Sequence, residues 1–418
     1  MPPSNNHGIV TDSREEAYRR LPSWIQPLIT LISGLPPQKQ LPVFHWTRTK
    51  INLTIAAWLL FGIAASTQGL RMSLDGQAIG LPMLVIGWLF TTGAFRASMT
   101  TVLHDIVHLL EKHCKRKHEL VYNHTLGWVG ELITILLLIP EVAVYYVEHV
   151  LKHHNGKTFC TLADPDAKLL YDLGFQPGKS RTAHWRTFWS RILIPWSRLY
   201  CLFTWERAKA QFANKNRVLG TVIVWTPIMY AIVRYDALSE FLIAYVVPLL
   251  FGIPAAALCQ FASEHNWLVK REDKSLRQHM EKTSRGRVFL DHVPTPQEWS
   301  ARLAFLWLRF WARTFFVHAP LRLVVCPFDL GTGHDLHHIG DEVIKKDRTL
   351  PVWANWMNSG YYRRWVEANC SSEFPLTTYY SLGDALDSVF DTYSKLEPEP
   401  YLEATTTPKE APHGLFGM

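Results

Sequence analysis

The chain has 418 residues, of which 48% are hydrophobic, and its formal net charge is +7. The apolar residues are concentrated in long runs with the charges between them, which argues against two or three soluble domains. Because the basic residues flank these runs, as in membrane proteins, we expect no nucleic-acid binding. The six cysteines form no C-x-x-C pair, which argues against a disulfide framework or a thiolate zinc site.

The first half of the chain contains two candidate membrane spans. Residues 1–50 are polar and rich in proline, so we expect a cytoplasmic leader with an interfacial segment rather than a secretory signal. Apolar runs at residues 51–70 and 81–102 follow, each close to the roughly 20 residues needed to cross a bilayer. A third stretch, residues 126–147, is interrupted by charged residues and a proline, and we expect a re-entrant or interfacial helix there.

The second half of the chain also contains candidate spans. Two more spans are predicted at residues 218–233 and 241–261, and the amphipathic stretch 303–325 is expected to lie in the membrane interface. The turns within each pair of spans hold few basic residues, so the positive-inside rule places both termini and the basic segments in the cytoplasm. We therefore expect an all-α integral membrane domain over residues 51–394, followed by a disordered tail at 395–418.

Four groups of histidines, the histidine boxes, lie at the predicted cytoplasmic ends of the apolar segments. Their patterns are H-x3-H, H-x3-H-H, a single histidine after a glutamate, and H-x2-H-H. The boxes comprise His104 and His108; His149, His153 and His154; His265; and His334, His337 and His338.

The spacing within the boxes indicates a two-metal centre. Residues four apart lie on one face of an α-helix, so both imidazoles of such a pair can reach one ion. The pairs of this kind are His104 and His108, His149 and His153, and His334 and His338. The neighbouring histidine of each doublet is turned by about 100° and can reach a second ion.

Imidazole is a good ligand for iron, copper, zinc and nickel. Each ligating histidine also needs its other N–H group held by a carboxylate or a carbonyl. Acidic residues beside the boxes are candidates for this role, namely Asp105, Glu148, Glu264 and Asp335. Two alternatives remain: a zinc hydrolase, which would need only about three histidines, and a non-enzymatic membrane haem or metal carrier, which would place paired histidines in the middle of the membrane.

The order of the boxes resembles the membrane fatty acid desaturase and hydroxylase superfamily over roughly residues 50–345. The Asp164-Pro-Asp166 segment and the Glu264-His265 element are similar to further features of that superfamily. The resemblance implies a mushroom-shaped helical fold with four spans and a cytoplasmic cap that holds a di-iron centre. It also implies that all nine box histidines ligate the two iron ions.

The second box, Glu148-His149-Val-Leu-Lys-His153-His154, is also similar to the E-H-x-x-G-H-H box of alkane monooxygenases, with Lys152 in place of glycine. The first and last boxes depart from the alkane monooxygenase patterns, and four predicted spans stand against six in those enzymes. These departures favour the desaturase branch.

The resemblance implies oxidation of an unactivated C–H bond in a fatty acyl or fatty acid chain, with O2 as co-substrate. Desaturation is the favoured outcome; hydroxylation of an alkyl chain and decarboxylation of a fatty acid to a terminal alkene are alternatives, because all three diverge after the first hydrogen abstraction. The sequence has no G-x-G-x-x-G fingerprint and no C-x-x-C pair for a fused iron–sulfur cluster. We therefore expect an external electron donor: a ferredoxin, a rubredoxin or a cytochrome with its reductase.

Overall fold

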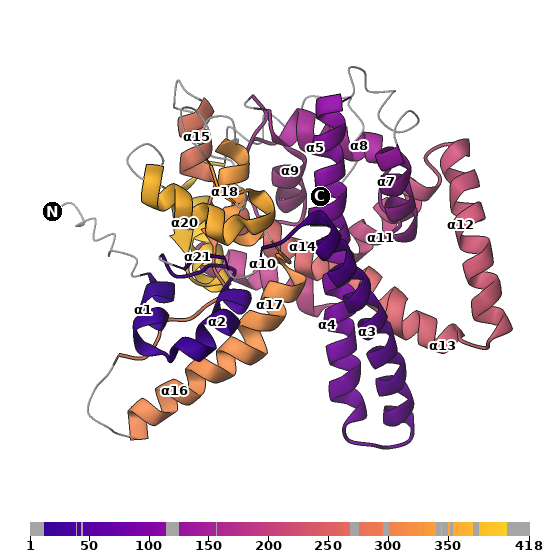
Figure 1. Cartoon of the computed structure of the whole chain (residues 1–418). Coiled ribbons are helices and arrows are strands. Elements are labelled where there is room, and N and C mark those ends of the chain that lie inside the picture. The colour runs from indigo at the N-terminus through magenta and orange to yellow at the C-terminus, as the bar shows by residue number, and fades with distance from the viewer. Residues whose placement is uncertain are drawn as a thin grey trace.

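The computed structural model describes most of the chain, and the predicted helical class is confirmed for that part. The described residues are 12–38, 40–42, 45–113, 125–155, 157–267, 276–295, 301–328, 330–339, 344, 350–351, 354–370 and 376–398. Within these ranges the only sheet consists of two short parallel strands, β1 (Gly286–Arg287) and β2 (Thr378–Tyr379). Figure 1 shows a helical body from which several long helices project on one side.

Four helices of the described chain are long and apolar enough to cross a membrane, as predicted. They run over Arg48–Leu74, Gly80–Leu110, Lys215–Arg234 and Leu238–Glu264. The first is α3 and the third is α12. The second is composed of α4 (Gly80–Ala97), η2 (Ser98–Leu103) and the start of α5 (His104–His113). The fourth is composed of α13 (Leu238–Phe241), η4 (Leu242–Val246), η5 (Pro248–Gly252) and α14 (Ile253–Glu264). Each helix extends a few residues beyond the predicted span, and the second carries the first histidine box on its own continuation.

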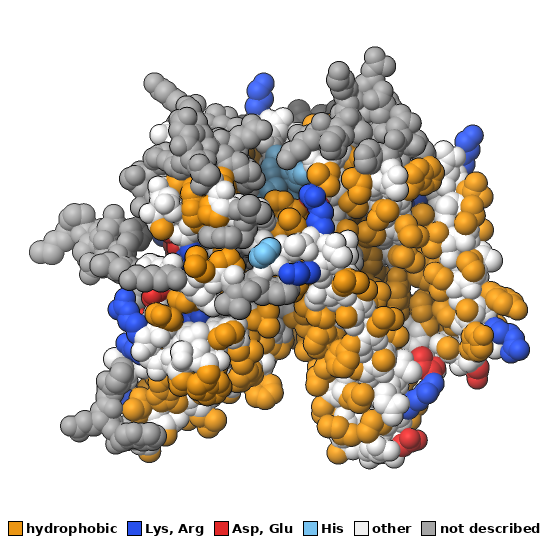
Figure 2. All heavy atoms as spheres, in the orientation of Figure 1, with side chains coloured by type: hydrophobic (Ala, Val, Ile, Leu, Met, Phe, Trp, Pro, Cys, Tyr) orange, Lys and Arg blue, Asp and Glu red, His pale blue; other side chains and the backbone are white. Residues whose placement is uncertain are grey.

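Helices α3 and α4 form a tightly packed hairpin (Figure 1). Glycines permit this close approach: a Cβ atom at Gly69 would clash with the backbone of Leu84, and one at Gly87 would clash with the backbone of Ser66. Small residues at such contacts let two backbones approach closely where packing rather than the hydrophobic effect drives association. The hairpin carries many exposed hydrophobic side chains, and Figure 2 shows them spread along its length, with charged side chains near its tip.

The stretch predicted at residues 126–147 does not form one continuous helix. It folds into α7 (Thr125–Leu136) and α8 (Val142–Tyr146), which leads into η3 (Val147–His153). Glu131 stabilises the break because its carboxylate accepts a hydrogen bond from the backbone N–H of Val142 (2.9 Å) and pairs with Arg217 (2.9 Å). The re-entrant or interfacial position of this stretch remains a prediction.

The amphipathic stretch at residues 303–325 lies within one helical rod, formed by α16 (Ala301–Arg313), η6 (Thr314–His318) and α17 (Ala319–Val324). Phe316 is 82% exposed on this rod, whereas Phe310 is buried in a small core with residues of the N-terminal segment. In Figure 1, α16 projects on the same side of the body as the α3–α4 hairpin. Its interfacial position remains a prediction.

The N-terminal segment folds onto the body through α1 (Ser13–Arg20), η1 (Ser23–Ile25) and α2 (Gln26–Ser33). Arg14 is fully buried and donates hydrogen bonds to the side chain of Gln26 and to the backbone oxygen of Leu35. The cytoplasmic position predicted for this segment stays a prediction. Of the predicted tail, residues 399–418 lie outside the described residues.

The remaining helices gather at the end of the molecule where the boxes lie. They are α9 (Pro165–Asp172), α10 (Arg181–Leu193), α11 (Arg198–Gln211), α15 (Leu276–Thr283), α18 (Leu330–Ile339), η7 (Trp356–Asn358), α20 (Ser359–Cys370) and α21 (Leu382–Lys395). The largest hydrophobic core runs from the inner ends of the apolar helices into this region. The boxes therefore lie next to the largest hydrophobic core of the described residues.

Candidate metal centre

The structure brings all nine box histidines together in two adjacent groups. In each group, one ring nitrogen from every member lies within 4.8 Å of those of all the other members. The first group consists of His104, His108, His149, His154 and His337, and the second group consists of His153, His265, His334 and His338. The members of both groups are buried or half-buried, and either group could hold a metal ion.

The Nε2 atoms of four members of the first group face one another at ligand-to-ligand distances. His337 Nε2 lies 3.0 Å from His104 Nε2 and 3.1 Å from His154 Nε2, which in turn lies 3.2 Å from His149 Nε2. An ion about 2.1 Å from each nitrogen would place neighbouring ligands about 3.0 Å apart at right angles. Hydrogen bonding alone cannot satisfy this arrangement, because one Nε2 atom of a neutral imidazole either donates or accepts and cannot do both.

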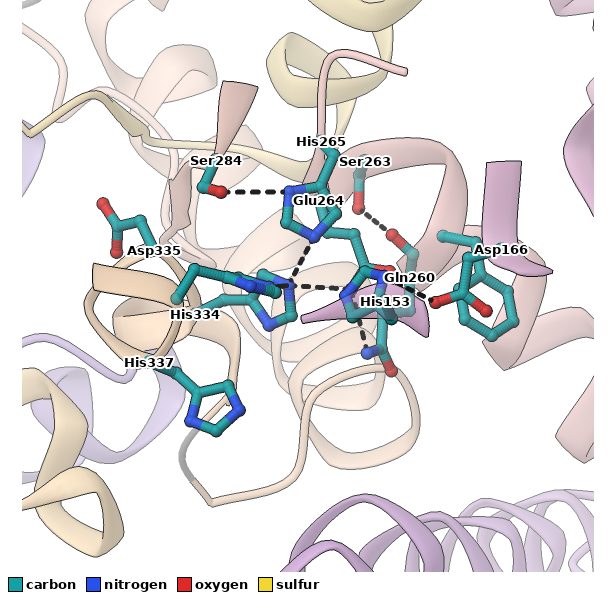
Figure 3. Close-up of polar contacts among 12 residues, drawn as sticks. His153, Asp166, Gln260, Ser263, Glu264, His265, Ser284, His334, Asp335 and His337 are labelled. Atoms are coloured by element: carbon teal, nitrogen blue, oxygen red, sulfur yellow. Dashed lines mark hydrogen bonds and ion pairs between the residues drawn. The ribbon is translucent and has the colours of Figure 1, made fainter. Parts of the chain in front are cut away.

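The second group repeats this geometry. His334 Nε2 lies 2.8 Å from His265 Nε2 and 3.2 Å from His338 Nε2. Figure 3 shows the ring of His265 between Ser284 and the ring of His334. The two groups adjoin, because the stacked rings of His154 and His338, one from each group, have centroids 4.7 Å apart.

Each histidine doublet supplies both groups, as its spacing predicts. His153 belongs to the second group and His154 to the first, while His337 belongs to the first and His338 to the second. Adjacent helical residues project in directions about 100° apart, so a doublet bridges two neighbouring positions. The two groups therefore form a single centre.

The prediction that His149 and His153 reach one ion is wrong. The segment Val147–His153 is a π-helix, in which hydrogen bonds connect residues five apart rather than four. The backbone N–H of His154 accordingly donates to the oxygen of His149 (3.0 Å). This wider turn places His154 beside His149 and leaves His153 to the second group.

A carboxylate that the sequence analysis did not assign to this role holds His153. The Nδ1 atom of His153 lies 3.1 Å from Asp164 Oδ2, on the side of the ring opposite Nε2. Asp164 is itself fixed, because it caps α9 by accepting from the N–H of Asp166 and also accepts from the N–H of Cys160. Burial alone would lower the pKa of His153, but the Asp164 carboxylate outweighs burial and raises it.

The second-group histidine that follows α14 is positioned by a hydroxyl. His265 ends α14 in an extended conformation and forms an isolated bridge with Ser284. The Ser284 hydroxyl lies 3.2 Å from His265 Nδ1. This contact joins residues 19 positions apart, so no local sequence pattern indicates it.

The four acidic candidates from the sequence have other surroundings. Asp105 pairs with Arg48 at 2.6 Å, and Asp335 forms two contacts of 2.8 Å with one nitrogen of Arg363. Glu148 is buried, neither of its oxygens has a hydrogen-bond partner among the described residues, and burial raises its pKa to about 9. Of the four, only Glu264 is shown close to a ring nitrogen of a box histidine, with its Oε2 atom 3.6 Å from His334 Nε2.

The electrostatic environment keeps most of the box histidines neutral. Burial, and then repulsion between neighbouring rings, lowers the pKa of both His149 and His338 well below 6.5. The pKa is lowered in the same direction, with burial as the largest cause, for His154, His265, His334 and His337. Neutral imidazole is the form that binds a metal ion.

A small cavity of about 110 Å³ lies beside the first group. Its lining includes Ile106, Leu109, Trp356 and the paired side chains of Arg48 and Asp105. The ring of Trp356 lies 6.2 Å from the ring of His104. The lining of the cavity is mostly apolar and includes a residue, Trp356, that lies beside a box histidine.

Comparison with known proteins identifies no relative of this chain: no protein-family model, no curated protein and no solved structure matches it. The superfamily resemblance of the boxes thus rests on their order and spacing in the sequence. Function has to be argued from the nine histidines and the groups around them.

Proposed function

We propose that the protein is a membrane-bound, non-haem di-iron oxidoreductase that uses O2 to oxidise an unactivated C–H bond in a fatty acyl or fatty acid chain, with desaturation as the favoured outcome. The convergence of nine histidines in two adjacent groups at the inner ends of apolar helices carries this proposal. Two bound iron ions would supply the O2 activation and the hydrogen-atom removal that such a bond requires.

The donor set favours two ions that prefer nitrogen ligands. A catalytic zinc site uses three protein ligands and a structural one uses four, whereas this centre offers five and four histidines. Imidazole suits iron as well as zinc, copper and nickel. The choice of iron rests on the histidine-box resemblance, and metal analysis tests it directly.

The surrounding residues orient the histidine rings for metal binding. Asp164 and Ser284 hold the Nδ1 sides of His153 and His265, which leaves the Nε2 atoms of these rings facing their group. Such outer partners fix the tautomer and the orientation of ligating histidines. Burial keeps most of the histidines unprotonated and limits the access of water to the reacting atoms.

The apolar helices and the small cavity favour a hydrocarbon substrate drawn from the bilayer. The cavity beside His104 is smaller than the roughly 300 Å³ at which ligand pockets begin, so it would admit only part of an alkyl chain without movement of α3 or of the segment around Trp356. We place the centre on the cytoplasmic side, because the predicted basic segments lie there. An external ferredoxin, rubredoxin or cytochrome would dock on that side and deliver electrons.

Mass spectrometry of the lipids and volatile hydrocarbons of a host that expresses the protein tests this function. The proposal predicts fatty chains that have lost two hydrogens. An added hydroxyl group or a shortened terminal alkene would instead identify hydroxylation or decarboxylation. The double variant His153→Ala/His154→Ala is the control, and a host whose lipids match this control would rule the proposal out.

A further inference from the structure

The two histidine groups are unequal, since the first has five members and the second has four. A glutamate borders the smaller group: Glu264 directly precedes His265 and has an oxygen close to a ring nitrogen of that group. We propose that the Glu264 carboxylate is the fifth ligand of the ion held by the second group. This inference rests on the proposed metal binding but not on the proposed reaction.

The distance between Glu264 and His334 fits a shared ion, while the four histidines without Glu264 form the group whose ligand atoms all lie within 4.8 Å of one another. Two atoms that each lie about 2.1 Å from an ion and 3.6 Å from one another subtend about 118° at the ion, and 3.6 Å is the separation of Glu264 Oε2 and His334 Nε2. By the same arithmetic, the contact of 2.8 Å between His265 and His334 subtends about 84°. Angles of this size occur together around a five-coordinate ion.

A buried network holds the carboxylate in place (Figure 3). The amide nitrogen of Gln260 donates to Glu264 Oε2 at 3.0 Å, and the amide oxygen of Gln260 accepts from Arg96. All three side chains are fully buried. Carboxylates that ligate metal ions are generally held by hydrogen bonds in this way.

The ion pair with Arg287 does not satisfy both oxygens of the Glu264 carboxylate. Arg287 lies 3.6 Å from Glu264 Oε2, which is beyond hydrogen-bond distance, and it donates instead to the backbone oxygen of Gln260 and to the hydroxyl of Ser263, each at 3.0 Å. The other oxygen, Oε1, is buried and has no hydrogen-bond partner among the described residues. Burying a charged oxygen without a partner is costly unless a nearby cation compensates the charge.

The proposed ligand makes the two ions chemically different. Neutral imidazoles leave the charge of an ion uncompensated, whereas one carboxylate neutralises part of it in a buried site. Asp164 cannot play the same part, because it contacts His153 at Nδ1, on the far side of the ring. The first ion would therefore have only imidazole ligands, and the second would have four imidazoles and one carboxylate.

Metal titration of the full chain tests the proposal. Detergent-solubilised protein is stripped with a chelator and titrated with Co2+ or Fe2+, and the wild type should bind two ions. Glu264→Gln preserves the size of the side chain and an oxygen that can accept a hydrogen bond. This variant should bind one ion normally and the other at least about tenfold more weakly.

Two control variants locate the effect. Glu240→Gln changes a glutamate at the opposite end of the same apolar helix, where it pairs with Arg71, and it should bind both ions normally. His108→Ala removes a member of the first group. It should lower the affinity for the ion of that group, whose binding Glu264→Gln leaves unchanged. Binding of both ions by Glu264→Gln with wild-type affinity would overturn the proposal.

Infrared spectroscopy of the wild type gives a second readout that needs no variant. Loading with metal should shift the stretching bands of one buried carboxylate, and an unchanged carboxylate spectrum would also overturn the proposal. Failure of this inference is distinguishable from failure of the proposed function. A wild type that binds no ions would refute both, whereas normal titrations without any hydrocarbon oxidation would refute the function alone.

Discussion

The Nδ1 atom of His153 lies 3.1 Å from Asp164 Oδ2, which leaves Nε2 of the same ring for the second histidine group. A carboxylate in this position fixes the tautomer of a ligating histidine and increases its basicity. Asp164→Asn should therefore lower the affinity of the second group for its ion by roughly 10- to 100-fold. Competition with a fluorescent chelator measures this change.

Asp172→Asn is the matched control for that prediction, because Asp172 is on the same short helix and pairs with Lys168 at the surface. The control should bind both ions with wild-type affinity. Equal affinities in the two variants would show that Asp164 does not support the centre.

The π-turn in the second box leads to a specific prediction about pairs of variants. Because His149 and His154 belong to the first group and His153 belongs to the second, His149→Ala should resemble His154→Ala and differ from His153→Ala. The first two variants should bind the ion of the first group more weakly, and the third should bind the ion of the second group more weakly. Mössbauer spectra of protein loaded with iron-57 would distinguish the ions, and a shared loss in His149→Ala and His153→Ala would contradict the structure.

The buried histidines should make the stability of the metal-free protein depend on pH. The pKa of His149, His154 and His338 is lowered from 6.5 in the folded protein. The unfolded chain therefore binds more protons below pH 6.5, and the free energy of unfolding falls as the pH decreases. His153, whose pKa is raised, has the opposite effect, because the stability it contributes is lost as the pH rises through its folded value.

The lowered pKa values outnumber the raised one, so we expect a net loss of stability towards acid. Denaturant unfolding of chelator-treated protein between about pH 8 and about pH 5 measures this effect. The midpoint should decrease below about pH 6.5, and loaded protein should release its ions over the same range because protons compete for the same nitrogens. A midpoint that stays constant or increases towards acid would contradict the prediction.

The ion pair between Asp335 and Arg363 should be important for folding. Both side chains are buried, and their contacts of 2.8 Å join α18, which carries the last box, to α20. Removing one partner of a buried pair leaves an uncompensated charge, so Asp335→Ala should lower the free energy of unfolding by about 3–5 kcal/mol.

Thermal unfolding of the metal-free protein would measure that change without any contribution from metal binding. Asp384→Ala, at the start of α21, is a comparison that does not involve a buried pair. An equal loss in the two variants would show that the buried pair has no special role.

The apolar helices and the boxes could be predicted from the sequence because both are local patterns. Long apolar runs have few structural alternatives, and the spacing of the doublets was sufficient to assign His153 and His154 to different groups. The pairing of His149 with His154 could not be predicted, because the regular α-helical period fails in the π-turn.

The partners of the histidines were less accessible to prediction. Asp164 carried a visible signal, an aspartate before a proline at the start of a helix, but its contact with His153 depends on the path of the loop between them. Ser284 comes from a separate segment and reaches His265 through a tertiary contact. The acidic residues next to the boxes in sequence were therefore poor guides to the groups that hold the histidines.

The metal content of the purified protein tests the central claim most directly. Elemental analysis of full-length protein from iron-supplemented cells, combined with Mössbauer spectroscopy, should give about two irons per chain in nitrogen-rich sites. One zinc per chain would support a hydrolase instead, and haem absorbance would support a carrier. Either of these results, or the absence of any tightly bound metal, would contradict the account.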